Sequence, residues 1–370
     1  MTRLPSLLSV VGARPNFMKL APVARALAAR GETRGVRHVV VHTGQHYDPE
    51  MSDAFFRDLQ LPRPDHSLGV GSGSHAHQTA AVMQRLEPVL LAEQPDVVLV
   101  YGDVNSTVAA ALVAAKLHIK VAHVEAGLRS RDRTMPEELN RIVTDHLADL
   151  LLAPSRDAIE NLVQEGIPAD RVQFVGNVMI DALKAALPGA RALAMPRRHG
   201  LTNRTYTMVT LHRPNNVDDP DTLRELLETL SLLAENGPVL FPVHPRTPAQ
   251  IGRLNGKATA PGVRLLEPLP YLEMLGLVSD AGLVITDSGG LQEETTWLGV
   301  PCVTVRPTTE RPITCAVGTN RLAPPRRAAI REAARAAIAG RPDTPPVLER
   351  WDGQTGERIA AVLCDGARFD

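Results

Sequence analysis

Residues 283–294, LVITDSGGLQEE, decide the fold of this 370-residue chain. A short, largely apolar run, residues 283–286, is followed by Asp-Ser-Gly-Gly, and a helical pattern then begins at once. This order predicts a strand, a tight turn and a helix N-terminus. Ser288 is the expected N-cap, and Gly289 and Gly290 let a ligand approach the backbone closely. Free amides at a helix N-terminus suit a phosphate, and Glu294, one turn later, suits two ribose hydroxyls. The alternative is an ordinary strand–turn–helix connection.

Outward from this stretch, short apolar strands alternate with helices along the chain. Strands are expected at 7–11, 37–43, 96–102, 120–127, 149–155, 171–176, 206–212, 238–245, 263–268, 283–286 and 301–305. Helices are expected near 15–30, 49–58, 78–93, 105–117, 136–147, 156–165, 219–235, 270–279, 325–340 and 353–364. Unbroken apolar strands separated by helices are typical of a parallel sheet covered on both faces, so the predicted class is α/β.

The alternation breaks once, and this break predicts two domains. Residues 188–204 are rich in Pro, Gly and Arg and are expected to form a linker or a surface loop. A chain of this length also favours two domains over one. We therefore expect one doubly wound, Rossmann-like domain at 1–176, joined by the C-terminal helix at about 353–370, and a second such domain at 177–352.

Composition and charge disfavour several classes of protein. The formal net charge is −1, which gives no reason to expect a nucleic-acid or anionic-membrane partner. No apolar run approaches the roughly 18 residues of a membrane helix. Cys302, Cys315 and Cys364 form no CxxC pair and no spacing typical of zinc. These features favour a reduced, cytoplasmic enzyme without a metal.

Polar side chains follow most of the predicted strands, where an α/β sheet binds its ligands. They are Arg14, Lys19, Gln45, His46, Asp103, Glu125, Glu137, His212, Arg213, His244, Asp287 and Ser288. No GxGxxG follows a strand, and no GxxxxGK[ST] or GxSxG is present. A dinucleotide cofactor, a P-loop nucleotide site and a hydrolase nucleophile elbow are therefore disfavoured.

Each candidate in the first half also has a structural interpretation. Arg14 and Lys19, five residues apart across a helix start, suit a diphosphate clamp or a solvated helix end. Asp103 suits catalysis or an N-cap for the helix that follows it. Glu125 ends an apolar strand, so we expect it to be partly buried, which suits acid–base work. The rival for Glu125 is a structural ion pair with Arg129.

Candidates later in the chain leave the same choice open. Glu137 and Glu138 follow Pro136 at a helix start, where acidic residues are common for helix-dipole reasons alone. His212 ends a strand and suits either a site or a capping role. Arg311 suits a cation beside the glycine turn, or a surface ion pair of little energetic value.

Taken together, the chain resembles the non-hydrolysing UDP-N-acetylglucosamine 2-epimerases. The matching stretches run nearly end to end: GARPNFMKLAPV (12–23), TGQHYD (43–48), YGDVNST (101–107), HVEAGLRS (123–130), MPEELNRIVTDHLADLLLAPS (135–155), VGN (175–177), TLHRPNNVD (210–218), PVHPRT (242–247), TDSGGLQEE (286–294), LGVPCVTVR (298–306), TTERP (308–312) and WDGQTGERIAAVL (351–363).

This resemblance implies a fold, a reaction and partners. The family has a glycosyltransferase-B-like fold, with two Rossmann-like domains and the active site in the interdomain cleft. Its members interconvert UDP-GlcNAc and UDP-ManNAc without a cofactor, by eliminating UDP to give a glycal and adding UDP back. Many members are homodimers, and in some bacterial ones a second UDP-GlcNAc binds as an allosteric activator.

The resemblance also implies roles for single residues. The catalytic positions correspond to Asp103, Glu125, Glu137 and His212. The substrate-binding positions correspond to Arg14, Lys19, Ser288, Gly289, Gly290, Glu294 and Arg311. The activator positions near the TGQH and HR segments correspond to Gln45, His46 and Arg213.

Some residues depart from the family pattern, and other functions stay open. The family often has HRxEN where this chain has Asn215 in place of the Glu, which leaves the uracil contacts, the activator response and the exact sugar open. The alternatives are a hydrolysing 2-epimerase, an epimerase of a modified UDP-sugar, a UDP-sugar-binding protein without turnover, and a transferase on the same scaffold.

Overall fold

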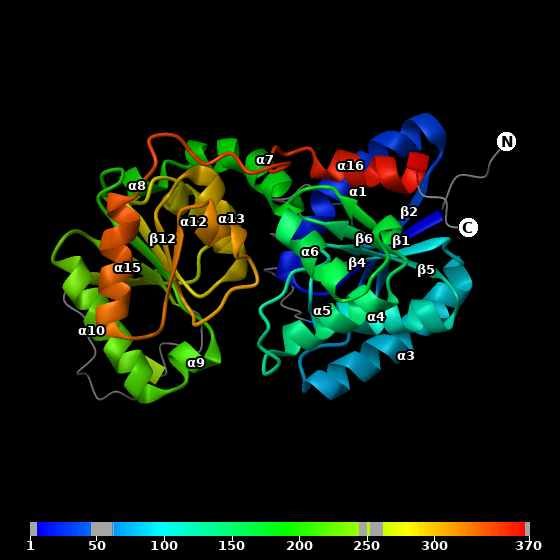
Figure 1. Cartoon of the computed structure of the whole chain (residues 1–370), viewed down its shortest axis with the longest axis horizontal. Coiled ribbons are helices and arrows are strands. Elements are labelled where there is room, and N and C mark those ends of the chain that lie inside the picture. Colours follow the sequence, from blue (N-terminus) through cyan, green and yellow to red (C-terminus); the bar gives the residue numbers. More distant parts are fainter. Residues whose placement is uncertain (1–5, 46–60, 62, 244–249, 252–261, 367–370) are drawn as a thin grey trace. The chain divides into compact units, whose positions relative to one another are not determined.

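The computed structural model describes residues 6–45, 61, 63–243, 250–251 and 262–366 (Figure 1). The chain forms two compact units, one of Met1–Lys184 with Glu349–Asp370 and one of Ala185–Leu348. Each unit contains one parallel sheet with helices on both faces, which confirms the predicted α/β class. The helix expected near 49–58 lies outside the described residues. Within the described ranges, every helix is too short or too polar to span a bilayer.

The first unit is built on a seven-stranded parallel sheet in the order β3-β2-β1-β4-β5-β6-β7. Its strands are β1 (Ser6–Val11), β2 (Arg37–His42), β3 (His66–Ser67), β4 (Val97–Tyr101), β5 (Lys120–Val124), β6 (Leu150–Ala153) and β7 (Val172–Phe174). Its helices are α1 (Arg14–Arg34), α3 (His75–Glu93), α4 (Asn105–Lys116), α5 (Pro136–Leu147), α6 (Arg156–Gln164) and α16 (Thr355–Ala361).

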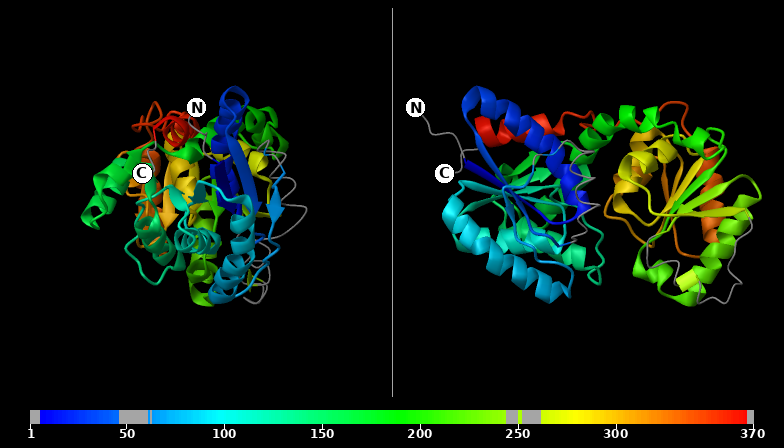
Figure 2. Two further views of the ribbon diagram at one scale, coloured as in Figure 1. Left: turned by 90° about the vertical axis from the view of Figure 1, so that its right-hand side faces the viewer. Right: turned by 180° about the vertical axis from the view of Figure 1, so that it is seen from behind.

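Helices cover both faces of this sheet. Figures 1 and 2 show α3, α4 and α5 on one face and α1 with α16 on the other. Leu86 and Leu90 of α3 pack with Val98 and Val100 of β4 in a buried apolar cluster. The continuous apolar runs of the strands arise because both faces of the sheet are buried.

The second unit is built on a six-stranded parallel sheet in the order β10-β9-β8-β11-β12-β13. Its strands are β8 (Thr207–Thr210), β9 (Val239–Pro242), β10 (Val263–Leu266), β11 (Leu283–Thr286), β12 (Cys302–Val305) and β13 (Asn320–Ala323). Its helices are α8 (Met195–Arg198), α9 (Pro214–Val217), α10 (Pro220–Ala234), α12 (Tyr271–Ser279), α13 (Gly289–Leu298), α14 (Ile313–Ala316) and α15 (Arg327–Ala339).

Alternate residues of these strands enter two separate cores. Val209 and Ile285 pack in the cluster that contains residues of α10 and α15. Met208 and Val284, their neighbours in sequence, pack in the cluster that contains residues of α12. The alternation follows from the two-residue period of a strand, which turns successive side chains to opposite faces.

In both units the strand order reverses beside the central strand. The reversal lies between β1 and β4 in the first unit and between β8 and β11 in the second. Loops that leave the carboxyl ends of such strands diverge to opposite faces of the sheet, and ligands bind where they separate. The loops after Val11, Tyr101, Thr210 and Thr286 are therefore the places to look for a site.

The prediction of a linker or surface loop at 188–204 is wrong for the helical residues up to Arg198 and holds for the turns at 199–204. Helix α7 (Val178–Ala192) continues through Pro188, and α8 begins three residues after α7 ends. Ala190 and Met195 are buried, and an added Cβ at Gly276 of α12 would lie 2.9 Å from the Ala190 carbonyl oxygen. The segment is helical because its apolar residues pack on the core, and this packing overrides the breaker composition.

Helix α16, near the C-terminus, belongs to the first unit. Helix α16 packs against α1, and the backbone amide of Gly356 donates to Oδ2 of Asp181 at 2.8 Å. Lys184 Nζ donates to the Asp352 carbonyl oxygen at 3.0 Å. Because of these bonds the first unit runs on to Lys184, past the predicted boundary at 176.

We expect Gly356→Ala to destabilise the first unit by about 1–3 kcal/mol, because both helices must move apart. The new Cβ would lie 2.7 Å from the Pro22 carbonyl oxygen. Gly189→Ala is the matched control, since an added Cβ there meets nothing within 4 Å and Ala favours the helix by up to about 1 kcal/mol. Urea unfolding of both variants checks the prediction, and equal midpoints would contradict it.

Candidate active site

Lys19 and Glu125 form a buried ion pair at the carboxyl end of the first sheet. Lys19 Nζ lies 2.9 Å from Glu125 Oε1, and both side chains are almost fully shielded from solvent. An added Cβ at Gly102 would lie 2.5 Å from the same Nζ, so Lys19 also lies against the turn that precedes Asp103. Lys19 is therefore not on a solvated helix end. Arg129, the alternative partner for Glu125, instead pairs with Asp145 and Glu165.

The backbone of Glu125 has a left-handed conformation, with φ of +73°. Few residues with a side chain adopt this conformation unless their surroundings hold them in it, and such residues cluster at functional sites. Here the amides of Glu125 and Ala126 both donate to the Leu152 carbonyl oxygen of the neighbouring strand, at 3.1 and 3.2 Å. The turn directs the Glu125 carboxylate toward Lys19 at the carboxyl end of the sheet.

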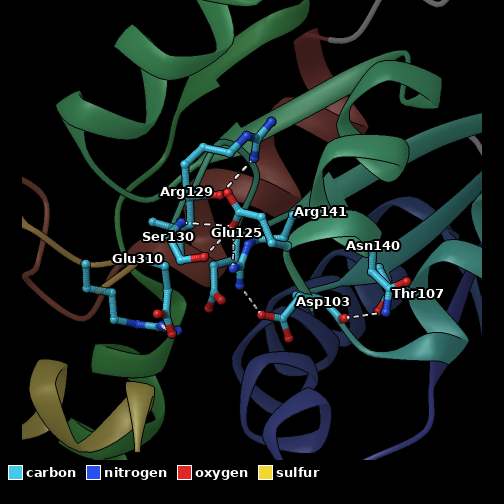
Figure 3. Close-up of polar contacts among 12 residues, drawn as sticks. Asp103, Thr107, Glu125, Arg129, Ser130, Asn140, Arg141 and Glu310 are labelled. Carbon is cyan, nitrogen blue, oxygen red and sulfur yellow. Dashed lines mark hydrogen bonds and ion pairs between the residues drawn. The ribbon is translucent and has the colours of Figure 1, made fainter. Parts of the chain in front are cut away.

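Asp103 is held by α5 and does not cap α4. Its carboxylate pairs with Nη1 of Arg141, and its carbonyl oxygen accepts from Asn140 Nδ2 at 2.9 Å (Figure 3). The N-cap of α4 is Val104, which excludes the capping interpretation of Asp103. Arg141 is among the largest fully buried side chains of the protein, so it fixes Asp103 firmly.

Glu137 and Glu138 are adjacent but have different surroundings. Glu138 is buried, and it accepts from the amides of Ser130 and Arg131 at 2.9 and 2.8 Å and from Arg141 at 2.7 Å. Burial favours the protonated form, but Arg141 and the Ser130 amide outweigh it and hold the pKa of Glu138 below its ordinary value. Glu137 is only partly buried, and no hydrogen bond or ion pair joins its carboxylate to another residue in the described ranges. Glu138 therefore holds the scaffold, while Glu137 presents a carboxylate.

Two more predicted residues of the first unit, Arg14 and Gln45, lie within the described ranges. Arg14 is exposed at the first position of α1. Gln45 is buried, and its Oε1 accepts from the amide and the hydroxyl of Ser106 at 3.1 and 2.7 Å. His46, like His244 of the second unit, lies outside the described residues.

In the second unit, His212 is paired with the buried carboxylate of Asp287. His212 Nδ1 lies 2.8 Å from Asp287 Oδ1, while about half of the His212 side chain is exposed. Asp287 also accepts from the amides of His212 and Arg213 and from Asn216 Nδ2, so the turn after β8 is fixed to the turn after β11. Burial favours the protonated form of Asp287, but His212 and Asn216 outweigh it and lower its pKa. A carboxylate on Nδ1 orients the imidazole, as in catalytic and metal sites.

The glycine turn has the predicted strand and helix, but Ser288 caps the helix differently from the expectation. Ser288 is the N-cap residue of α13, yet its side chain makes no capping bond. Its amide instead donates to Thr286 Oγ1 at 2.9 Å, which fixes the turn from the strand side. The first amides of a helix have no partner within the helix, and here they include those of Gly289 and Gly290.

Arg311 lies against Gly289, as the sequence suggested. An added Cβ at Gly289 would lie 2.6 Å from Arg311 Nη1. Arg311 is buried and pairs with Glu293 at 2.9 Å and with Glu310 at 2.5 Å, and Arg306 pairs with Glu310 at 2.8 Å. The interpretation of Arg311 as part of a surface ion pair is therefore wrong, because Arg311 and its partners Glu293 and Glu310 are buried. The turn needs glycine to admit the guanidinium.

Glu294 is buried in α13 beside Tyr271, whose hydroxyl donates to Oε1 at 3.0 Å. Burial raises the pKa of Glu294 to about 7, with a further contribution from the charge of Glu293 and against the effect of the Tyr271 hydrogen bond. The carboxyl group therefore changes its charge near neutral pH.

The structure thus gathers the predicted residues into two groups. One group in the first unit contains Lys19, Asp103 and Glu125, and one in the second contains His212, Ser288, Gly289, Glu294 and Arg311. Sequence reasoning gave Arg141 no role and counted Asp287 only among the polar residues at strand ends, whereas both orient members of these groups. Among the described residues, no cluster of three His, Cys, Asp or Glu side chains is suited to hold a metal ion.

A family model described as UDP-N-acetylglucosamine 2-epimerase matches residues 28–364. The chain belongs to this epimerase family. The match covers most of both units, so the resemblance read from the sequence motifs is confirmed.

Relatives of this 2-epimerase family member include enzymes named for two different sugars. A UDP-N-acetylglucosamine 2-epimerase of Methanococcus maripaludis is 42% identical over 85% of this chain and 86% of its own length. A UDP-2,3-diacetamido-2,3-dideoxy-D-glucuronate 2-epimerase of Pseudomonas aeruginosa is 42% identical over 96% of this chain and 99% of its own.

A solved structure of the family also matches both units. The crystal structure of Methanocaldococcus jannaschii UDP-GlcNAc 2-epimerase in complex with UDP-GlcNAc and UDP has a TM-score of 0.87 and 40% identity, and the match covers 97% of this chain and 99% of that one. This similarity confirms the predicted glycosyltransferase-B-like fold class.

The pKa of Glu294 predicts a pH-dependent stability of the second unit. Above pH 4.5, the ordinary pKa of glutamic acid, the unfolded chain loses this proton while the folded protein keeps it up to about pH 7. The Glu294 contribution to stability therefore falls as pH rises from 4.5 to about 7 and is constant above.

We expect Glu294→Gln to remove this dependence. When the pH is raised from 5 to 8, the unfolding free energy of the variant should increase by about 2 kcal/mol relative to that of the natural protein. Urea unfolding at both pH values measures it. A variant whose stability runs parallel to that of the natural protein over this range would show that Glu294 is ionised throughout.

Proposed function

We propose that the protein catalyses the reversible C2 epimerisation of UDP-GlcNAc to UDP-ManNAc. The observation that carries the proposal is the buried Lys19–Glu125 pair beside the Asp103 turn, in a chain of the 2-epimerase family. Relatives with about 40% identity bear the name of this activity, and one solved relative holds UDP-GlcNAc and UDP. The fixed carboxylates of the first unit and the glycine turn of the second, which is suited to a phosphate, support this proposal.

In the proposed reaction, a carboxylate removes the C2 proton while the bond from C1 to the UDP oxygen breaks. The electrons of the C–H bond form the C1–C2 double bond of a glycal, and UDP leaves with the electrons of the C–O bond. A proton then returns to C2 from the opposite face, and UDP adds back at C1. Two faces of C2 exchange protons, so more than one acid–base group is required.

The proposed acid–base groups are Asp103, Glu125, Glu137 and His212. Asp103 and Glu125 are held by Arg141 and Lys19. Glu137 extends from the first turn of α5. His212 is oriented by Asp287, with much of its ring exposed. Groups held in this way lose little free energy to reorganisation when charge develops in the transition state.

The second unit is proposed to bind UDP. The amides after Ser288, the cation of Arg311 under Gly289 and the carboxyl of Glu294 are suited to the diphosphate and the ribose. Arg14 and Lys19 are proposed to contact the diphosphate from the first unit. The function therefore requires residues of both units on one substrate molecule, and the location of that site in the interdomain cleft stays a prediction.

A second candidate substrate is favoured by a specific observation. The Pseudomonas aeruginosa relative, named for a diacetamido-glucuronate, matches 96% of this chain. The same elimination at C2 applies to that sugar, so only the contacts around C3 and C6 distinguish the two substrates.

Other details also stay predictions. They are a homodimer, a cytoplasmic location and an activator site that contains Gln45, His46 and Arg213. Sedimentation velocity tests the dimer, and a sigmoidal dependence of rate on UDP-GlcNAc concentration tests the activator.

We expect UDP-GlcNAc incubated with the protein in deuterium oxide to gain UDP-ManNAc and to carry deuterium at C2. Proton NMR reports the product and the exchange in one experiment. A parallel sample with UDP-2,3-diacetamido-2,3-dideoxy-D-glucuronate tests the second candidate. Release of free ManNAc would identify a hydrolysing enzyme, and binding without exchange of either sugar would identify a binding protein.

We expect Glu125→Gln to lower the exchange rate by about 100- to 10,000-fold, because the amide cannot accept the C2 proton. UDP binding, measured by calorimetry, should persist, since the residues proposed to bind UDP, apart from Arg14 and Lys19, lie in the other unit. Glu93→Gln is the matched control, because Glu93 is a paired carboxylate of the same unit that bonds Arg37 and His66. Unaltered turnover in Glu125→Gln would remove Glu125 from the acid–base role.

A further inference from the structure

A buried histidine lies beneath the turns that carry Asp103 and Glu125. His123 is in β5, two residues before Glu125, and its side chain is fully buried. Its Nε2 lies 2.8 Å from the Gly102 carbonyl oxygen, and its Nδ1 lies 2.6 Å from Oδ1 of Asp145. Both ring nitrogens therefore face oxygen atoms.

These two contacts define the protons on the ring. A carbonyl oxygen only accepts hydrogen bonds, so Nε2 of His123 carries a hydrogen. Nδ1 and a carboxylate oxygen at 2.6 Å also need a proton between them, because two lone pairs would repel at that distance. Burial favours the protonated form of Asp145, but His123 and Arg129 outweigh it and lower its pKa. One proton therefore lies between His123 and Asp145, and another lies between His123 and the Gly102 carbonyl oxygen.

The second oxygen of Asp145 extends the network. Asp145 Oδ2 accepts from the Gly127 amide at 3.1 Å and pairs with Arg129 Nη1 at 2.7 Å. Arg129 in turn makes two bonds to Glu165, at 2.7 and 2.8 Å. Charges of opposite sign alternate along the network, so each buried ion has a compensating partner.

The network holds two turns that are both in the left-handed conformation. Gly102, which precedes Asp103, has φ of +63°, and its carbonyl is fixed by His123. Glu125 and Gly127 have φ of +73° and +86°, and the Gly127 amide is fixed by Asp145. A side chain in this conformation needs a surrounding structure that holds it in place. The hydrogen-bonded pair of His123 and Asp145 thus connects the turn of Asp103 to the turn of Glu125.

We propose that His123 and Asp145 are positioning residues for the epimerisation, which hold the Asp103 and Glu125 carboxylates in a fixed relation through the Gly102 carbonyl and the Gly127 amide. The inference rests on the proposed function, because these carboxylates are assigned to the reaction there. His123 and Asp145 act through the two turns.

The hydrogen bond from His123 to the Gly102 turn is measured on the natural protein. With histidine labelled with ¹⁵N, we expect a ring N–H signal that is protected from exchange with solvent, because His123 is fully buried and its Nε2 donates to the Gly102 carbonyl oxygen. Loss of this signal in His123→Gln assigns it to His123. Absence of any protected ring N–H would overturn the proposal. The measurement needs no turnover, so it stands even if the proposed function fails.

Two substitutions separate the two contacts of His123. His123→Asn keeps a donor toward Asp145, and His123→Gln keeps a donor toward Gly102. We expect each to lower kcat by about 100-fold, because displacement of a reacting group by about 1 Å has an effect of this size, with little change in KM. Rates are normalised to the folded fraction at a temperature below unfolding.

The matched control is His66→Gln, which breaks a histidine–carboxylate pair with Glu93 in the same unit. We expect its kcat to equal that of the natural protein. If the His123 variants do not fold, Asp145→Asn, which keeps the shape and removes the charge, is used for the kinetic test. Folded variants whose kcat equals that of the natural protein would overturn the proposal. No C2 exchange by the natural protein would instead refute the proposed function.

A double variant tests whether His123 acts through Asp103. In an Asp103→Asn background we expect His123→Asn, which loses the contact to Gly102 and keeps the donor toward Asp145, to add little further loss, since the Asp103 carboxylate that this contact positions is already gone. A full 100-fold further loss in that background would show that His123 acts independently of Asp103, and would overturn the positioning role.

Discussion

Compensation of buried charge is the constraint on which both candidate groups depend. An ion in a protein interior without a partner costs several kcal/mol, so a carboxylate at a buried strand end needs a cation or several donors. Lys19 meets this need for Glu125 in the first unit, and His212 and backbone amides meet it for Asp287 in the second. Because every bond to these groups also fixes a turn, compensation of charge and orientation of the site have the same structural cause.

The fold was largely predictable because its signals are local. A two-residue period, a glycine after an apolar run and a helical stripe each lie within one segment, and the strand–turn–helix of 283–298 is present as expected. The first half of the second unit was harder. Pro188 and Gly189 suggested a loop, whereas burial of Ala190 and Met195 on the core keeps the segment helical.

The candidate residues of the site could be predicted from the sequence, but the residues that pair with them and orient them could not. Polar residues at strand ends are visible in sequence, but Asp103 and Arg141 are 38 positions apart and meet only through the packing of α4 and α5. The spacing of residues along α5 contained a signal that the sequence analysis did not use. Glu138, Arg141 and Asp145 are spaced by three and four residues, so they share one face of α5, and all three are buried. That face predicts a scaffold role for Glu138 and leaves Glu137 on another side of the helix.

The return of α16 to the first unit has a consequence for biosynthesis. The second unit is one continuous insertion, Ala185–Leu348, whereas the first needs Glu349–Asp370 from the far end of the chain. Domains generally fold as the ribosome releases them, from the N-terminus onward. Here the order is inverted, because the inserted unit is complete while α1 still lacks the helix that packs on it. A nascent chain stalled before residue 349 would thus leave the α1 surface uncovered, as a target for chaperones.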